Sequence, residues 1–170
     1  MLTHRAAEKK DLDQIIRLIA NARSYIASQG IDQWQDGYPE PELIENDMDQ
    51  GIGLVFEEDE KICAYMVLMD IPEPVYDDLE GRWLSDMPYA TIHRMAIDDG
   101  FRGKGVSAAM LKRAEEYALE RSLGSVRADT HTGNKAMRGL LEKSGYVHCG
   151  EVRYEVTAGD PIRVAYEKVL

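Results

Sequence analysis

The chain has 170 residues, enough for one hydrophobic core built from a sheet and several helices, and we expect a single domain over residues 1–170. Hydrophobic residues make up 44% of the chain and charged residues 30%, a composition that excludes disordered and fibrous proteins. The net charge of −11 argues against nucleic acid as a partner, and the absence of a long apolar run argues against a membrane protein or a signal peptide, so we expect a cytoplasmic location.

The first seventy residues predict a strand, two helices and a β-hairpin. Asp11, with Gln14 three residues later, has the pattern of a capping box before a helix of regularly spaced apolar residues, and Gly30 is placed to end that helix. The expected elements are a strand at residues 2–5, helices between Asp11 and Gly30 and at 42–48, and strands at 54–56 and 62–69, joined by the acidic turn 57–60.

The remainder of the chain alternates between predicted strands and helices. Residues 71–88 contain three prolines and a glycine, so we expect a loop with a function of its own, as a lid or a pocket wall. The expected elements are strands at 89–97, 125–130, 146–152 and 162–168 and helices at 103–121 and 134–143. This alternation predicts an α/β fold with a mixed sheet and helices on both faces.

Acidic residues are concentrated in one segment. Eleven of the 31 lie between residues 32 and 60, where there is no lysine or arginine, so the rest of the chain carries 20 acids against 20 bases. We interpret this run as a solvated surface, the usual role of such segments. The alternative is a negative field that attracts a cationic acceptor.

The two cysteines predict two reduced thiols. Cys63 and Cys149 lie far apart and lack the CxxC spacing of a zinc site. We therefore expect neither a disulfide framework nor a bound metal.

A turn with two glycines joins a predicted strand to a predicted helix, with the sequence Arg102-Gly103-Lys104-Gly105-Val106-Ser107. Unbonded N–H groups at a helix start, the helix dipole and close backbone approach at glycine would let such a turn hold a phosphate group. Residues 101–113 include four basic residues and no acid. The spacings of a Walker loop and of a GxGxxG fingerprint are both absent, and by itself the hexapeptide could equally be a tight turn.

This turn resembles the coenzyme A-binding motif Arg/Gln-x-x-Gly-x-Gly/Ala of the GNAT superfamily of N-acetyltransferases. The likeness extends to Met95-Ala96-Ile97, Asn134 and Lys143-Ser144-Gly145-Tyr146, and the chain departs from the motif at Ser107, where the family has Gly or Ala. The resemblance implies a mostly antiparallel central sheet of about six to seven strands with helices on both faces. It also implies an acetyl-CoA-dependent N-acetyltransferase that acetylates a primary amine of a small molecule by direct attack in a ternary complex.

The resemblance also assigns the residues that bind acetyl-CoA. The backbone amides from Arg102 to Ser107 would hold the pyrophosphate, and the main chain of residues 95–97 would pair with the pantetheine arm as an added strand does. Asn134 would contact the cofactor, although its position also suits a helix cap.

Acetyl transfer to an amine needs a base that removes a proton from the ammonium form. One family position for this base falls on Thr91, which cannot serve, and another falls on Asp129. Strand alternation places Asp129 on one face with Arg127 and His131, so an Arg127–Asp129 ion pair or a helix-capping role is the alternative. His93 and His131 are further candidates, and His93 is the better placed, so we assign catalysis to Asp129 and His93.

The general acid of the family is a tyrosine seven residues after the asparagine, where this chain has Leu141. A thiol with a pKa of about 8.5 is a tolerable leaving group that water can reprotonate, so catalysis does not require this tyrosine. Tyr146 or Tyr154 could substitute, and a covalent route through Cys149 is less favoured.

The acceptor site in this family is commonly built by the first two helices, their loop and the strand edges beside the thioester. The residues we expect to bind the acceptor are Trp34, Tyr38, Tyr76, Trp83 and His131. Aromatic rings beside carboxylates suit a cationic amine, whereas the two tryptophans could equally be packing residues.

Two other functions stay open. One is N-terminal acetylation of a protein, which Asp129 favours and Leu141 disfavours. The other is a catalytically silent GNAT-fold module that binds acyl-CoA. By family likeness alone, we expect a homodimer.

Overall fold

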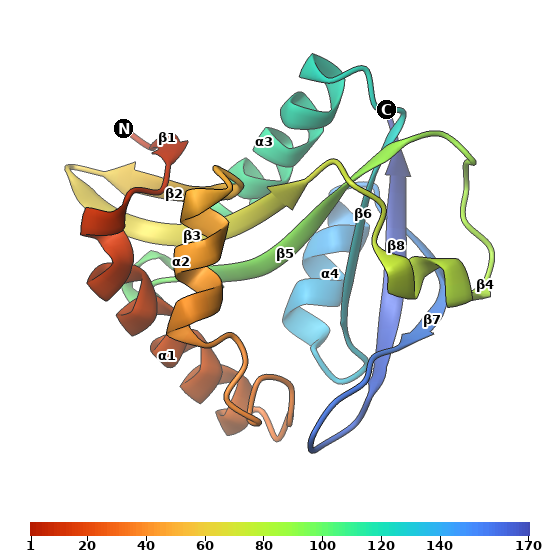
Figure 1. Cartoon of the computed structure of the whole chain (residues 1–170), viewed down its shortest axis with the longest axis horizontal. Coiled ribbons are helices and arrows are strands. Elements are labelled where there is room, and N and C mark those ends of the chain that lie inside the picture. The colour runs from red at the N-terminus through yellow and green to blue at the C-terminus, as the bar shows by residue number, and fades with distance from the viewer.

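The computed structural model describes all 170 residues, and its elements follow the expected order (Figure 1). The helices are α1 (Leu12–Ser28), α2 (Pro41–Asp49), α3 (Val106–Glu120) and α4 (Lys135–Lys143), with 3-10 turns η1 (Lys9–Asp11), η2 (Pro74–Asp78) and η3 (Asp99–Phe101). The strands are β1 (Thr3–Ala6), β2 (Gly53–Glu58), β3 (Lys61–Met69), β4 (Glu80–Gly81), β5 (Tyr89–Ile97), β6 (Ser125–His131), β7 (Val147–Arg153) and β8 (Ile162–Val169).

All eight strands form one sheet in the order β1-β2-β3-β5-β6-β8-β7-β4. Neighbouring strands are antiparallel except β5 and β6, which confirms the expected mixed, mostly antiparallel α/β fold. The sheet has slightly more strands than expected, because two residues of the loop at 71–88 form β4. Gly81 makes this pairing possible, since a Cβ atom there would collide with the backbone of Cys149 and Gly150 in β7.

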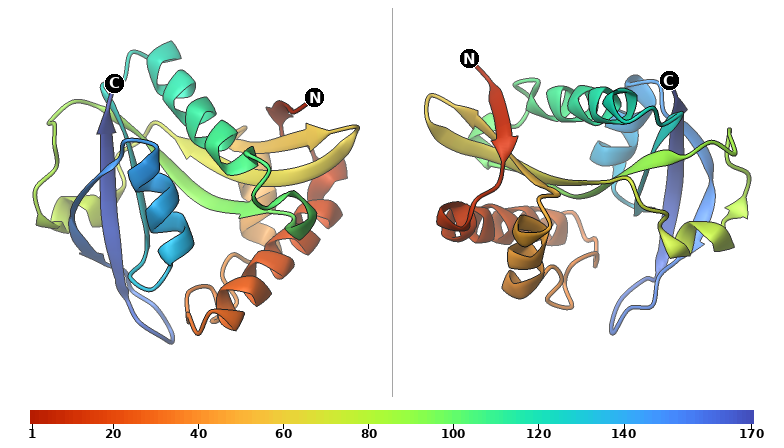
Figure 2. Two further views of the ribbon diagram at one scale, coloured as in Figure 1. Left: turned by 180° about the vertical axis from the view of Figure 1, so that it is seen from behind. Right: turned by 45° about the horizontal axis from the view of Figure 1, so that its top comes forward.

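Helices cover both faces of the sheet, as Figure 2 shows. Side chains alternate along β3, so that Tyr65 and Val67 pack under α1 and α2, whereas Met66 and Leu68 pack under α3. The two faces therefore bury two separate apolar clusters. None of the helices is both long enough and apolar enough to cross a membrane.

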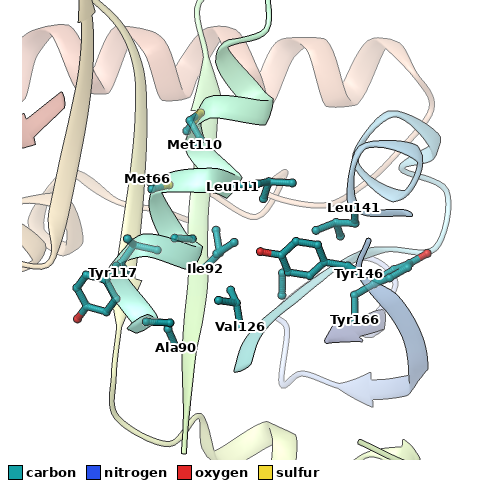
Figure 3. Packing of buried hydrophobic residues seen from close by; sticks show 14 of the residues in the cluster. Met66, Ala90, Ile92, Met110, Leu111, Tyr117, Val126, Leu141, Tyr146 and Tyr166 are labelled. Atoms are coloured by element: carbon teal, nitrogen blue, oxygen red, sulfur yellow. The ribbon is translucent and has the colours of Figure 1, made fainter. Parts of the chain in front are cut away.

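The larger apolar cluster lies between the sheet and helices α3 and α4 (Figure 3). Met110 and Leu111 of α3 and Leu141 of α4 are almost fully buried there, together with Ile92 of β5. Leu141, at the position where the resemblance implies a catalytic tyrosine, is thus a core residue. Tyr146 lies in the same cluster, and its hydroxyl has no hydrogen-bond partner.

Strands β5 and β6 run together for only part of their length. Residues 89–92 of β5 pair with residues 125–128 of β6, but β5 continues to Ile97. Beyond this point the two strands diverge, as Figure 1 shows. The edge of β5 that faced β6 is therefore left without a strand neighbour.

The loop at 71–88 covers the face of the β6–β8–β7 region opposite α4. Tyr76 of η2 packs on Val152 of β7 and Ala165 of β8 in a third, small apolar cluster. The indole ring of Trp83 lies 4.0 Å from the guanidinium of Arg127. This loop therefore covers its part of the sheet and buries apolar side chains there, as the helices do on the rest of the sheet.

Arg127 does not form the ion pair with Asp129 that the sequence left open. Its Nε donates to Oε1 of Glu167 at 3.0 Å, and Glu167 is fully buried. Glu167 also accepts hydrogen bonds from the hydroxyl of Ser85 and the amide of Leu84, which fixes the loop to β8. Burial alone would raise the pKa of Glu167, but its hydrogen-bond donors lower it overall.

Two helix starts differ from expectation. Asp11 precedes α1 without capping it, because Asp11 ends η1 and its Oδ2 accepts from the backbone amide of Glu8 at 2.8 Å. α3 begins at Val106 and not at residue 103, because Gly103 and Gly105 have positive φ angles that a right-handed helix cannot contain.

Most acidic residues between 32 and 60 are exposed, as expected for a solvated surface. Glu57 and Glu58 are half-buried, and Asp47 is 1% exposed and ion-paired with Arg94 of β5. One carboxylate of the acidic segment is therefore part of the interior.

Replacing Glu167 by glutamine should destabilise the protein by about 3–5 kcal/mol, because Arg127 would lose its charged partner in a buried setting. Urea unfolding followed by circular dichroism measures this. The matched control is Glu120→Gln, which removes an exposed carboxylate from Arg113 and should leave the unfolding midpoint close to that of the wild type. A Glu167→Gln protein as stable as this control would contradict the structural role of the buried pair.

Candidate active site

The turn before α3 leaves a set of backbone amides without partners in the protein. Gly103 and Gly105 have φ angles of 73° and 84°, which glycine adopts without steric cost. The amides of Gly103, Gly105, Val106 and Ser107 donate to no protein atom. A Cβ atom at either glycine would meet open space, so the glycines are needed for conformation and not for packing. The turn can therefore receive an anion.

Two other amides that were expected to bind the pyrophosphate are used within the turn. The amide of Arg102 donates to the carbonyl of Asp99, and that of Lys104 to the carbonyl of Phe101. The Arg102 guanidinium also lies 3.8 Å from the ring centre of Tyr25 in α1. The amides of Arg102 and Lys104 thus stabilise the turn itself. The amides that remain for an anion are those of Gly103, Gly105, Val106 and Ser107.

A groove of about 310 Å³ connects this turn with the free edge of β5. Met95, Ala96 and Ile97 form one wall, and the start of α4 forms another. Asn134 caps α4 by accepting a hydrogen bond from the amide of Met137 at 3.1 Å, and it also lines the groove. The groove therefore brings together the turn before α3, residues 95–97, which were expected to pair with pantetheine, and Asn134.

The groove opens into a larger cavity of about 490 Å³. Ile26, Met95, Asn134 and Met137 line both spaces, so one ligand can extend from the groove into the cavity. The cavity walls come from the loop between α1 and α2, from β5 and β6, and from the segment between β7 and β8.

A β-bulge in β5 aims two consecutive side chains into this cavity. Tyr65 of β3 pairs with Ala96 and Val67 pairs with His93, so that Arg94 and Met95 together face a single residue of β3. Arg94 has a φ angle of 51°, in the left-handed region. The extra residue shifts the alternation of side chains between the two sheet faces by one position. His93 and Arg94 therefore both line the cavity.

Arg94 is fully partnered by buried groups. Its Nε and Nη2 donate to the two oxygens of Asp47 at 2.8 and 2.6 Å, and its Nη1 donates to the hydroxyl of Tyr38 at 2.7 Å. Tyr65 also donates to Asp47, at 3.0 Å. This network ties α2 and the loop before it to β5, and its two charges cancel.

His93 is oriented by a carboxylate from the loop at 71–88. Its Nε2 lies 2.9 Å from Oε2 of Glu73, and the hydrogen bond from His93 lowers the pKa of Glu73. With Nε2 engaged in this way, Nδ1 is the nitrogen that has no protein partner, and His93 lines the cavity. A carboxylate-bound imidazole with one free nitrogen is suited to accept a proton.

Asp129 is held by two tyrosines. Its Oδ2 accepts hydrogen bonds from the hydroxyls of Tyr76 and Tyr154 at 2.8 and 2.9 Å, whereas Oδ1 has no partner in the protein. Burial raises the pKa of Asp129, although both hydroxyls and the nearby His93 act in the opposite direction. Asp129 lines the cavity with His93, so the two residues assigned to catalysis lie in one site.

The profile of the Acetyltransferase (GNAT) family matches residues 19–146 of the sequence. The chain belongs to the GNAT family. It is therefore an acetyl-CoA-dependent acyltransferase.

Related proteins are similar over most of the chain. A crystal structure of a GNAT-family acetyltransferase from Streptococcus agalactiae matches with a TM-score of 0.88 and 38% identity over 99% of this chain and 95% of that one. The uncharacterised N-acetyltransferase YesJ of Bacillus subtilis is 24% identical over 145 residues, which cover 83% of this chain and 79% of YesJ. The PaiA N-acetyltransferase of Thermoplasma acidophilum, crystallised with coenzyme A, shares the fold at 16% identity with a TM-score of 0.74, over 100% of this chain and 99% of that one.

The residues expected to bind the acceptor divide into two groups in this GNAT enzyme. Trp34 and Tyr38 line the cavity. Tyr76 and Trp83 do not: Tyr76 lies behind Asp129, and the Trp83 indole donates to the backbone carbonyl of Tyr76 at 3.1 Å. His131 also lies outside the cavity, where its Nε2 is 3.2 Å from Asp32.

The other candidates from the sequence lie at different depths in the fold. Thr91 is fully buried, and the Cys149 thiol, whose pKa is raised by burial, lines neither the groove nor the cavity. Tyr146 is in the core, whereas Tyr154 is in the cavity. The structure contains no group of three or more His, Cys, Asp or Glu side chains placed to hold a metal ion.

Four charged residues of the cavity were not predicted: Glu73, Arg94, Glu155 and Arg163. Arg94 follows His93 and would point to the opposite face of an unbroken strand, so only the bulge brings it into the site. Glu73 and Arg163 carry no local signal, because their positions depend on how a loop and a strand end pack in three dimensions. The loop at 71–88 does form a cavity wall, as expected, but through Glu73 and not through its aromatic residues.

Gly103→Ala should weaken binding of coenzyme A by about tenfold, because an L-residue with positive φ costs about 1–2 kcal/mol and the turn would relax away from its shape. Isothermal titration calorimetry measures this. Gly139→Ala is the matched control, since Gly139 lies within α4 at negative φ with open space around it and lines neither cavity. Equal affinity in both variants would contradict the role of the turn.

Proposed function

We propose that this GNAT enzyme transfers the acetyl group of acetyl-CoA to the primary amine of a small molecule by direct attack in a ternary complex. The observation that carries the proposal is the continuity between the groove, which reaches the turn with free amides at Gly103 and Ser107, and the cavity with His93 and Asp129. A thioester anchored by its diphosphate at the turn and lying along β5 would end beside these two residues. The coenzyme A complex of the Thermoplasma protein of similar fold supports this use of the groove.

The free groups of the groove match the parts of acetyl-CoA in order. The four amides and the dipole of α3 would bind the diphosphate. On the edge of β5 that has no strand neighbour, the backbone of residues 95–97 would hydrogen-bond the amides of the pantetheine arm as an added strand does. Asn134 lies where groove and cavity meet and would contact the end of that arm.

The size and lining of the cavity favour a small cationic acceptor. A volume of about 490 Å³ lies within the range of roughly 300–1,000 Å³ typical of small-molecule sites. Trp34 and Tyr38 offer aromatic faces, and Asp36, Asp129 and Glu155 offer carboxylates. These features support a small amine over a protein N-terminus as the acceptor.

Asp129 and His93 would have different roles in activating the amine. Asp129 attracts the ammonium form, and Nδ1 of His93 accepts the proton that must leave before nitrogen attacks the thioester carbon. The charge of Glu73 stabilises the imidazolium that results. When the tetrahedral intermediate collapses, the C–S bond breaks and the thiolate takes its proton from water. Tyr154 is a poor donor, because burial raises its pKa and its proton is bound to Asp129.

The direct test is an assay of thiol release from acetyl-CoA with a panel of small primary amines. The proposal expects release that depends on the amine and is accompanied by formation of the acetylated amine. Binding of coenzyme A without release for any amine would support the silent module instead. Release only with a peptide N-terminus would support the protein acetyltransferase.

His93→Gln should lower kcat by about 100-fold or more, the usual range for loss of a general base, without changing the affinity for coenzyme A. Steady-state kinetics and calorimetry measure the two effects. His148→Gln is the matched control, because His148 is an exposed histidine of β7 outside the cavity. A His93→Gln enzyme with wild-type kcat would remove His93 from the mechanism.

Asp129→Asn should lower turnover by about tenfold or more while leaving the protein at least as stable as the wild type at pH 7.5. A carboxyl whose pKa is raised by folding favours the folded state at low pH and loses this contribution as the pH rises through its folded pKa, so ionised Asp129 is a cost at pH 7.5. Thermal unfolding at decreasing pH from 7.5 toward the ordinary aspartate pKa of about 3.9 should show the advantage of the variant shrinking. A variant that is less stable at pH 7.5 and fully active would make Asp129 a structural residue.

A further inference from the structure

Resting on the proposed function, we propose that the acceptor carries a carboxylate close to its amine and that Arg163 binds this carboxylate. The acceptor would then be a small amino acid, with its amine at His93 and Asp129 and its acid group at Arg163. Arg163 would determine specificity and take no part in the proton transfer.

Arg163 is a buried cation on the cavity wall. It is 7% exposed and belongs to β8, on the same face of the sheet as Ala165 and therefore as the loop at 71–88. Its Nη1 donates to the backbone carbonyls of Asp160 and Ile162 at 2.5 and 2.8 Å, which fixes the side chain in place. The side chain is thus rigid as well as buried.

The rest of the Arg163 guanidinium has no partner in the protein. No carboxylate lies within 4.0 Å of it, and Nε and Nη2 make no hydrogen bond. Neither nitrogen is among the fully enclosed polar atoms that lack a partner, so both keep accessible surface. Nε and Nη2 form one edge of the guanidinium, the arrangement that matches the two oxygens of a carboxylate.

The other basic side chains of the cavity already have acidic partners. Arg94 is paired with both oxygens of Asp47, and His93 is paired with Glu73. A buried charge is costly unless it is paired, so Arg163 is the position where an anion from outside the chain gains most. Asp129 attracts Arg163 through space, but its Oδ2 is occupied by two tyrosine hydroxyls and it forms no ion pair with Arg163.

The register of the sheet sets the spacing between the two ends of the acceptor. Asp129 pairs with Ala165, and His131 pairs with Arg163, so that Asp129 and Arg163 are diagonal neighbours on one face of β6 and β8. Diagonal neighbours in antiparallel strands are about 7–8 Å apart. A compact molecule with an ammonium and a carboxylate only a few bonds apart can contact both side chains at once.

The test compares amino acids with their own carboxamides, which keep the amine and lose only the negative charge. The wild-type enzyme should acetylate the acids with a kcat/KM about 10- to 100-fold above that of the amides, the range expected for a hydrogen-bonded charge pair. Arg163→Gln should remove this preference, and Arg163→Lys should retain part of it. Arg153→Gln is the matched control, because Arg153 is exposed on β7 outside the cavity and should keep the full preference.

Three results would overturn the inference: equal rates for acids and amides in the wild type, acetylation of diamines alone, or an unchanged preference in Arg163→Gln.

Calorimetry of the same compounds against the coenzyme A-loaded protein separates this inference from the proposed function. Carboxylate-dependent binding that is lost in Arg163→Gln would support the role of Arg163 even if no acetyl group moves, a result that would contradict only the proposed function. Absence of such binding would overturn the role of Arg163. Unchanged affinity of Arg163→Gln for coenzyme A shows that the variant is folded.

Discussion

The end of the pairing between β5 and β6 after Ile92 is the constraint on which both halves of the active site depend. If the two strands stayed together, the backbone of residues 95–97 would be satisfied by β6 and could not bind a pantetheine arm. The same divergence makes room for the cavity between β5, β6 and the two N-terminal helices. The bulge at Arg94 accompanies it and turns His93 and Arg94 toward one side. The divergence from β6 therefore produces the free edge of β5 and the cavity, and the bulge against β3 sets the orientation of His93 and Arg94.

Charge inside the molecule is organised by the loop at 71–88 and by α2. Glu73 orients His93, Tyr76 donates to Asp129, and Asp47 neutralises Arg94. Glu167 pairs with Arg127 and also holds the loop at 71–88 to β8. Each buried charge so paired is fixed in position, and Nδ1 of His93, Oδ1 of Asp129 and the Nε–Nη2 edge of Arg163 keep atoms without a protein partner in the cavity.

The sequence predicts the elements well because their signals are local. The strand expected at residues 89–97 has the observed bounds of β5, and the two glycines before α3 mark a turn that needs positive φ. The sequence does not predict features that depend on how distant parts of the chain pack against each other. The bulge is one, since nothing in residues 92–97 distinguishes a bulged strand from a regular one. The direction of Tyr76 and Trp83 is another, because the loop had to cover a sheet face whose position the sequence does not give.

A crystal structure of the enzyme with coenzyme A tests the central claim most directly. The account predicts diphosphate oxygens within hydrogen-bond distance of the amides of Gly103, Gly105, Val106 and Ser107, pantetheine along residues 95–97, and the sulfur at the junction of groove and cavity beside His93. A diphosphate bound elsewhere, or a sulfur directed away from His93 and Asp129, would contradict it.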